Sequence, residues 1–160
     1  MKPTNEPTFT FKHLFVEYSR FHLDSSNQLI HLVFIPIIVC TMMGLALHVE
    51  ALRTQVFGTG LTVVFFVWTF ISLFYLKADV VVGLLAWLMG VGLYIIASRN
   101  FMAEDMFYTC LGLHLFGWIT QIVGHGIYEK RAPAITTNLL FLFIAPFFVI
   151  IEILQWFGFR

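Results

Sequence analysis

The chain has 160 residues, of which 59% are hydrophobic and only 11% are charged, and its mean hydropathy is +0.88. A soluble domain carries roughly a quarter charged residues, so the composition argues against a water-soluble fold and indicates an all-α, polytopic membrane protein. The formal net charge of zero gives no support for nucleic-acid binding.

The first element in chain order is an amphipathic segment ahead of the apolar runs. Its apolar residues recur every three to four positions, which is the pattern of one face of a helix. The charges of the first 23 residues are not accompanied by a continuous apolar stretch, so we expect no cleavable signal peptide. We predict a helix on the membrane surface whose apolar face carries Phe11, Leu14, Phe15, Tyr18 and His22.

The next four residues, Asp24-Ser25-Ser26-Asn27, interrupt this pattern. Their side chains compete for backbone hydrogen bonds and favour helix N-caps. We therefore expect the chain to turn here, and a new helix to begin near Asn27 and enter the bilayer.

Five charge-free runs follow. Each is close to or above the ~20 residues that an α-helix needs to cross a ~30 Å hydrocarbon core. We predict a single membrane-embedded domain over residues 1–160, with about five transmembrane helices after the surface helix. The predicted spans are residues 29–48, 56–76, 80–98, 106–128 and 138–156.

If all five spans cross, the Lys and Arg residues divide unequally between the two sides of the membrane. The positive-inside rule assigns the richer side to the cytosol, and this side contains the N-terminus. Six lie on the N-terminal side and three on the other: Lys2, Lys12, Arg20, Lys77, Lys130 and Arg131 against Arg53, Arg99 and Arg160.

Two segments, residues 18–31 and 114–133, hold an unusual density of polar groups for a membrane protein. An even number of crossings separates the entrance of the first span from the exit of the fourth, so polar groups at these two points share one membrane face. A single interfacial histidine is more often structural, but ionisable groups gathered in a membrane usually mark function. The residues expected on this face are His22, His31, His125 and Glu129.

Helix geometry limits which of these histidines can share a ligand. On one continuous helix His22 and His31 would diverge by about 180°, and the break between them removes this objection. His114 and His125 return to nearly the same helical face but are separated by ~16 Å of rise. Either the helix loosens at the glycines flanking His125, or His114 serves differently.

The ligand types available point to particular metals. Imidazoles with a possible carboxylate and no thiolate suit zinc or non-haem iron. Cys40 and Cys110 lie inside apolar runs without a CxxC pair, so neither a disulfide nor a thiolate site is suggested. His13 and His48 lack polar companions at suitable spacing, and we interpret both as structural.

The motifs in these two polar segments resemble those of one family. The first is Tyr18-x3-His22-x4-Asn27-x3-His31-x4-Pro36, and the second is Trp118-x2-Gln121-x2-Gly124-His125-x3-Glu129-x3-Pro133-Ala134. This pattern is similar to that of the fungal 2-hydroxy fatty acid dioxygenases, which are membrane proteins of the endoplasmic reticulum. Members commonly carry a Gly shortly before the proline of the first motif, where this chain has Val33-Phe34-Ile35, and we expect this difference to alter helix packing more than chemistry.

The resemblance implies a chemistry and a cofactor. The family performs an iron(II)-dependent α-oxidation in which a 2-hydroxy fatty acid reacts with dioxygen and loses one carbon, during breakdown of phytosphingosine-derived or similar acids. By resemblance, iron(II) would be held by His22, His31 and His125, with His114 as a fourth ligand or a deeper pocket residue. The substrate tail would lie among the spans, in contact with the lipid bilayer.

Further residues receive hypothetical roles on the same basis. Three polar residues would be catalytic by orienting ligands or substrate: Glu129, Asn27 and Gln121. Three others would bind substrate: Tyr18, Arg131 and Lys130. The two cations are explained equally well by the positive-inside rule.

Two other functions are compatible with these residues. The main alternative is a non-catalytic transporter or scaffold whose polar cluster lines a cavity or joins helices. The second is a haem-binding electron carrier with paired axial histidines from different spans, which a Soret absorption band would identify.

Overall fold

The structure is a computed structural model, which describes residues 11–52 and 61–159. All regular elements in these two ranges are helical. The α-helices are α1 (Phe11–Ser19), α2 (Ser25–Leu47), α3 (Val63–Ala78), α4 (Val80–Asn100), α5 (Phe107–Gly124) and α6 (Phe141–Trp156). The shorter helices are η1 (Glu50–Leu52), η2 (Glu104–Met106), the π-helix η3 (His125–Glu129) and η4 (Ala134–Thr136).

Three stretches of the described residues are long and apolar enough to cross a membrane. They are α2, α4 and the continuous helical stretch Glu104–Glu129 that contains α5. Two further apolar helices, α3 and α6, are shorter. The start of the predicted second span, residues 56–60, lies outside the described residues.

Aspartates begin two of these helices where the sequence predicts a turn. Asp24 is the N-cap of α2, and its carboxylate accepts hydrogen bonds from the backbone N–H groups of Ser26 and Asn27. Asp79 separates α3 from α4 and accepts a hydrogen bond from the N–H of Val82 at 2.9 Å. Such caps satisfy orphan N–H groups at a helix start, which explains why both turns are so short.

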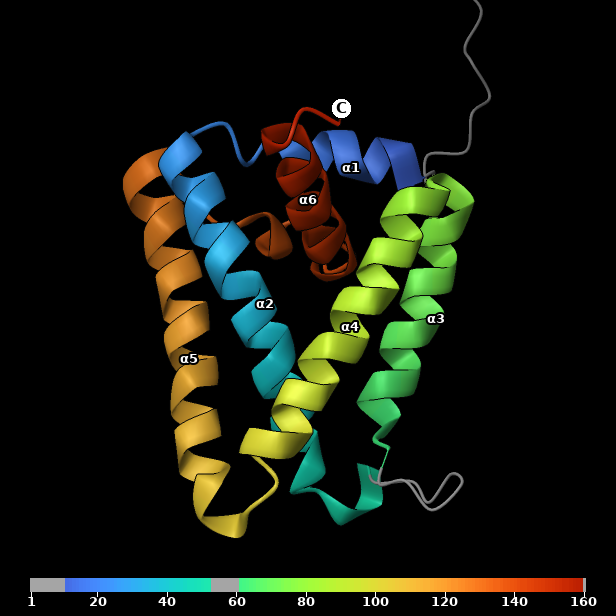
Figure 1. The fold of residues 1–160 in the computed structure, drawn as a ribbon. Helices are drawn as coiled ribbons and strands as arrows, with labels where there is room; N and C mark the ends of the chain where they lie inside the picture. Colours follow the sequence, from blue (N-terminus) through green and yellow to red (C-terminus); the bar gives the residue numbers. More distant parts are fainter. Residues whose placement is uncertain (1–10, 53–60, 160) are drawn as a thin grey trace, which may run out of the picture.

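The long helices run side by side, and α1 lies across one end of the bundle (Figure 1). In this view α5 and α3 stand at opposite flanks, with α2 and α4 between them. α5 packs mainly against α2, and α3 packs mainly against α4. The helix predicted ahead of the first span is therefore present. Its buried residues Leu14 and Tyr18 pack against α6, however, so much of its apolar face covers protein and not lipid.

The predicted fifth crossing is not confirmed. Figure 1 shows α6 in the half of the bundle nearer α1, with the C-terminal end on the α1 side. Phe141, at the start of α6, has its ring centroid 5.8 Å from that of Tyr18 on α1, and Phe147 has its centroid 4.2 Å from that of Phe11. The charge-free run that predicted this span includes η4 and irregular residues before α6, so only part of the run forms the continuous helix α6.

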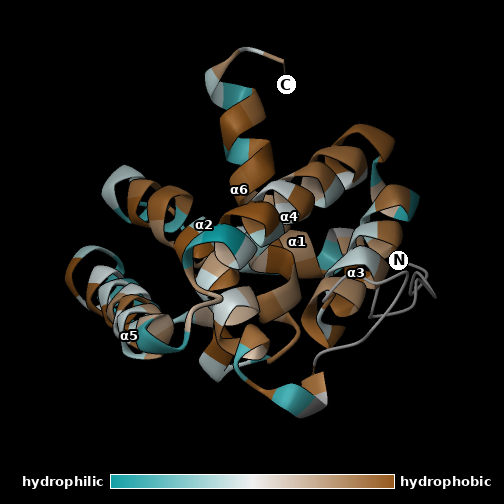
Figure 2. Ribbon diagram, turned by 60° about the horizontal axis from the view of Figure 1, so that its bottom comes forward, coloured by the Kyte–Doolittle hydropathy of each residue, from teal (hydrophilic) through white to brown (hydrophobic). Residues whose placement is uncertain are grey.

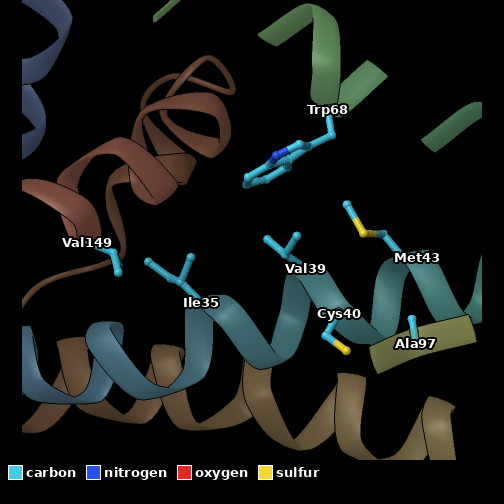
Figure 3. Packing of buried hydrophobic residues seen from close by; sticks show 7 residues of the cluster. All are labelled: Ile35, Val39, Cys40, Met43, Trp68, Ala97 and Val149. Atoms are coloured by element: carbon cyan, nitrogen blue, oxygen red, sulfur yellow. The ribbon is translucent and has the colours of Figure 1, made fainter. Parts of the chain in front are cut away.

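Apolar side chains fill the space between the long helices. Ile35, Val39 and Met43 lie on one side of α2 and point toward Trp68 of α3 (Figure 3). Cys40 and Cys110 are buried and free. Hydrophobic residues dominate the long helices, and hydrophilic residues gather at their ends and turns (Figure 2). This distribution suits a protein whose flanks face lipid and whose ends face water.

Candidate metal centre

Three histidines from separate parts of the fold meet near the α1 end of the bundle. His22 lies between α1 and α2, His31 lies on α2, and His125 begins η3 at the end of α5. Each offers one ring nitrogen, and these three nitrogens lie within 4.8 Å of one another. All three side chains are buried. The structure thus brings together the three histidines that the sequence predicts on one membrane face.

The backbone determines which ring nitrogens of His22 and His31 carry hydrogen. His22 Nδ1 donates to the carbonyl oxygen of Tyr18 at 2.8 Å, and His31 Nδ1 donates to that of Asn27 at 2.9 Å. Because a carbonyl oxygen only accepts, each neutral ring keeps a bare lone pair on Nε2. The two Nε2 atoms lie 3.0 Å apart. Two lone pairs at this distance repel each other unless they share a cation.

The separation fits a metal ion bound by both rings. With metal–nitrogen bonds of about 2.1 Å, two ligands at right angles lie about 3.0 Å apart. Paired axial ligands of a haem lie on opposite sides of the iron, about 4 Å apart. The 3.0 Å separation of these Nε2 atoms therefore argues against an axial haem pair. Imidazoles without a thiolate suit non-haem iron or zinc.

The environment keeps His22 in the protonation state that a ligand needs. Burial, with a further contribution from the neighbouring His31, lowers the pKa of His22 to about 2. The imidazole is therefore neutral at physiological pH, and a neutral imidazole is the form that binds metal.

Asn27 connects the other two histidines. Its backbone oxygen accepts the hydrogen bond from His31. Its side chain is fully buried, and the side-chain Nδ2 lies 3.4 Å from His125 Nδ1. The side-chain Oδ1 has no partner. Nδ2 also donates to the carboxylate of Glu129, which keeps the amide hydrogens on the side of His125 and Glu129. Asn27 can therefore orient two ligands at once.

The helix carrying His125 loosens where the sequence allows it. α5 ends at Gly124, and His125–Glu129 continues as a π-helix. The π-helix ends at Lys130, whose φ of 53° is left-handed and whose N–H donates to the carbonyl oxygen of His125. A Cβ atom at Gly124 would lie 2.8 Å from Asn27 Oδ1, so only glycine permits this close approach of α5 to α2. Single π-turns occur frequently at functional sites.

Glu129 ties the segment carrying His22 to the helix carrying His125. Its Oε1 accepts hydrogen bonds from the backbone N–H groups of Leu23 at 2.7 Å and Asp24 at 2.9 Å. Its Oε2 lies 3.3 Å from the guanidinium of Arg131. Through these bonds the carboxylate holds the backbone that follows His22.

His114 lies apart from the three histidines, and both of its ring nitrogens are occupied. Nδ1 donates to Thr41 Oγ1 at 3.0 Å, while Nε2 accepts from the indole N–H of Trp118 at 3.1 Å. The Nε2 lone pair is therefore engaged. His114 lines a cavity that also contacts the three histidines. Of the two roles considered for His114, this position matches that of a deeper pocket residue.

This cavity has a volume of about 550 Å³ and extends from the histidines between α2, α3 and α5. Among the described residues that line it, none is charged. The polar lining includes His22, His31, His125 and Gln121. The rest is mostly aliphatic and aromatic, with η4 and the start of α6 covering the part nearest the histidines. The space thus has one polar end and one apolar body.

Three polar groups of the lining are available to a ligand at or near this end. Gln121 Nε2 and Tyr75 Oη are buried and have no hydrogen-bond partner. Burial, with a contribution from nearby Tyr75, raises the pKa of Tyr18 far above its usual range, so its hydroxyl stays protonated and can donate. The sequence contains no local signal for Tyr75, which lies alone in an apolar run.

The two cations considered for substrate binding lie outside the lining. Arg131 donates to the backbone oxygen of Arg20 and to Glu129, and its guanidinium lies 5.0 Å from the ring centroid of Phe21. Lys130 is exposed. The structure brings neither residue to the cavity.

Comparisons with known proteins agree with this picture. A family model described as "2-hydroxy-palmitic acid dioxygenase Mpo1-like" matches residues 8–156. The chain is 34% identical over 143 residues to the 2-hydroxy-palmitic acid dioxygenase MPO1 of Saccharomyces cerevisiae, covering 89% of this chain and 78% of the relative. No solved structure matches the chain.

Proposed function

The chain belongs to the Mpo1-like 2-hydroxy-palmitic acid dioxygenase family, and from this premise we propose that it α-oxidises 2-hydroxy fatty acids to acids one carbon shorter. The observation that carries the proposal is the meeting of three buried imidazoles with the closed end of an apolar cavity. The imidazole end suits the carboxylate and hydroxyl of a 2-hydroxy acid, and the apolar cavity suits its acyl chain. The scaffold and transporter alternatives give no reason for two bare Nε2 atoms 3.0 Å apart.

The proposed cofactor is iron(II), held by His22, His31 and His125. Bound iron would supply the electron chemistry that allows dioxygen to react with a closed-shell organic acid. Three protein ligands would leave positions for substrate and dioxygen. Asn27 and Glu129 would act as positioning residues that hold these histidines.

The overall reaction balances without an added reductant. A 2-hydroxy acid, RCH(OH)COOH, and O₂ together contain the atoms of RCOOH, CO₂ and H₂O. Carbon 2 is oxidised from an alcohol to a carboxylic acid, carbon 1 leaves as CO₂, and dioxygen accepts all the electrons. The chain would therefore need only substrate, dioxygen and iron(II).

The substrate head would be held by neutral hydrogen-bond donors. The hydroxyls of Tyr18 and Tyr75 and the amide N–H of Gln121 can donate to a carboxylate in a cavity whose lining carries no formal charge among the described residues. A hydrogen bond to a charged group contributes about 1.5–3 kcal/mol. Arg131 and Lys130 would instead serve the orientation of the chain in the membrane.

The proposed topology is one membrane-embedded domain in the endoplasmic-reticulum membrane. We propose that α2, α3, α4 and α5 cross the membrane. The segment after α5 enters the bundle from the histidine side, and α6 leads back to that side, so there are fewer crossings than the five predicted. Of the described cations, Arg20, Lys77, Lys130 and Arg131 then lie on the histidine side and Arg99 on the other. This distribution supports a cytosolic histidine side.

The test of the function is conversion of 2-hydroxypalmitic acid by the purified protein supplied with iron(II). We expect oxygen-dependent formation of the acid one carbon shorter, with CO₂ in equal amount. Folded protein that converts none of the acid under these conditions would overturn the proposal.

A further inference from the structure

The cavity is closed at the histidines and open at its side. Tyr75 and His125 at the closed end are 1% and 2% exposed. Other lining residues have large exposed fractions, including 48% for Val67 on α3 and 55% for Ile122 on α5, one helical turn before His125. Because α3 and α5 make at most marginal contact within the described residues, these two side chains form the opposite rims of a lateral opening.

The opening faces the part of the molecule that would be surrounded by lipid. Val67 lies within the apolar helix α3, and Ile122 lies within the membrane-crossing stretch Glu104–Glu129. An exposed apolar residue on such a helix contacts acyl chains and not water. A ligand that passes between these rims therefore comes from the hydrocarbon core.

The length of the cavity suits an acyl chain. Along α5 and the start of η3 it extends from His114 to His125, and on α2 from His31 to Met42, eleven residues in each case or ~16 Å at ~1.5 Å per residue. An extended chain with C–C bonds of ~1.5 Å rises about 1.25 Å per carbon, so about thirteen carbons cover this length. Longer chains must end outside the cavity.

We propose that the acyl chain of the substrate enters sideways from the bilayer between α3 and α5, and that its end remains in the lipid when it is longer than the cavity. The inference rests on the proposed function and names the route and length tolerance of its substrate. The protein would thus bind membrane-dissolved 2-hydroxy acids without an upper limit on chain length.

The first test compares chain lengths in the wild-type protein in lipid nanodiscs. We expect kcat/KM for 2-hydroxytetracosanoic acid to lie within about threefold of that for 2-hydroxypalmitic acid. A drop of more than about tenfold for the longer acid would show a closed cavity and overturn the proposal. Failure of both acids would count against the proposed function itself, which distinguishes the two.

The second test narrows the opening from both rims. The blocked variant combines Val67→Phe with Ile122→Phe. The control combines Leu73→Phe with Ile119→Phe, on the same two helices, at residues 55% and 58% exposed that do not line the cavity. Binding to the metal-free protein is read separately, as quenching of tryptophan fluorescence by a 2-hydroxy acid brominated at mid-chain, which would lie near Trp68 and Trp118.

The blocked variant should lose about tenfold in kcat/KM for 2-hydroxypalmitic acid and should show weaker quenching, while its iron content equals that of the control. The control should behave as wild type in all three measurements. Equal activity and equal quenching in the two variants would overturn the proposal.

Discussion

The Nε2 atoms of His22 and His31 lie 3.0 Å apart, and each ring donates its Nδ1 hydrogen to the backbone oxygen four residues before it. The two contacts are alike although the residues belong to different segments. They hold both lone pairs toward one point before any ion arrives. Such preorganisation lowers the cost of binding, because the rings need not be turned or deprotonated first.

Substitutions at Glu129 separate a positioning role from a catalytic one. Glu129→Gln keeps an oxygen that can accept from the N–H groups of Leu23 and Asp24, so we expect metal binding and most activity to remain. Glu129→Ala leaves both groups without this acceptor, which costs about 1–3 kcal/mol and releases the segment carrying His22. Metal content and kcat of the two purified variants check this. Loss of kcat in Glu129→Gln with full metal content would instead indicate proton transfer by Glu129.

Two neighbouring glycines provide a matched pair for the approach of α5 to α2. Gly124→Ala would place a methyl group 2.8 Å from Asn27 Oδ1 and 3.0 Å from Ile30 Cδ1, displacing the residue that orients His125. At Gly126 an added Cβ meets nothing within 4 Å. We expect Gly124→Ala to weaken iron(II) binding by about tenfold or more, since partners that orient a ligand typically matter by 10–100-fold. Gly126→Ala should bind as wild type, and equal affinities would contradict this account.

The unpaired hydroxyl of Tyr75 predicts a substrate effect without a metal effect. Tyr75→Phe removes one donor to the carboxylate, so we expect kcat/KM to fall by roughly tenfold to a hundredfold. Because the ring remains, packing against Phe147 and the iron content should not change. An unaltered kcat/KM would show that the hydroxyl does not reach the substrate.

Burial of His22 predicts how the metal-free protein responds to acid. Its pKa falls from the ordinary 6.5 to about 2 on folding, so between these values the unfolded chain binds a proton that the folded chain does not. The contribution of His22 is complete above pH 6.5 and is lost as the pH falls, by up to about 1.4 kcal/mol per pH unit. Unfolding of metal-free wild type and His22→Gln at pH 7.5 and 5 isolates this slope. Identical slopes would contradict the neutral, buried ring.

Much of this arrangement follows from local patterns in the sequence. Asp24 caps α2 because a short acidic side chain can accept from the first free N–H groups, and the resulting turn lets His22 fold back over His31. Counting the predicted membrane crossings was enough to place His125 on the same membrane face as His22 and His31. The loosening of the helix beside Gly124 was one of two explanations for the spacing of His114 and His125. The hydrogen bonds of His114 with Thr41 and Trp118 also support the second explanation, in which His114 has a different role from His125.

Other features depend on contacts between distant segments, and the periodicity of the sequence does not predict such contacts. Lack of charge in residues 132–151 predicted a crossing, but whether such a run forms one helix depends on its partners, and α6 packs against α1. Tyr75 lies in an apolar run with no motif around it. Arg131 was considered as a partner of the substrate carboxylate, but its guanidinium donates to Glu129 and to the backbone oxygen of Arg20.

The most direct test of the metal centre is anaerobic iron(II) binding by the wild type and four single variants: His22→Ala, His31→Ala, His125→Ala and His114→Ala. The account predicts that the first three lose the iron while the His114 variant keeps it, because His114 Nε2 is already bonded to Trp118. Iron retained by folded His31→Ala, or lost from folded His114→Ala, would contradict the assignment of the three histidines as the ligands.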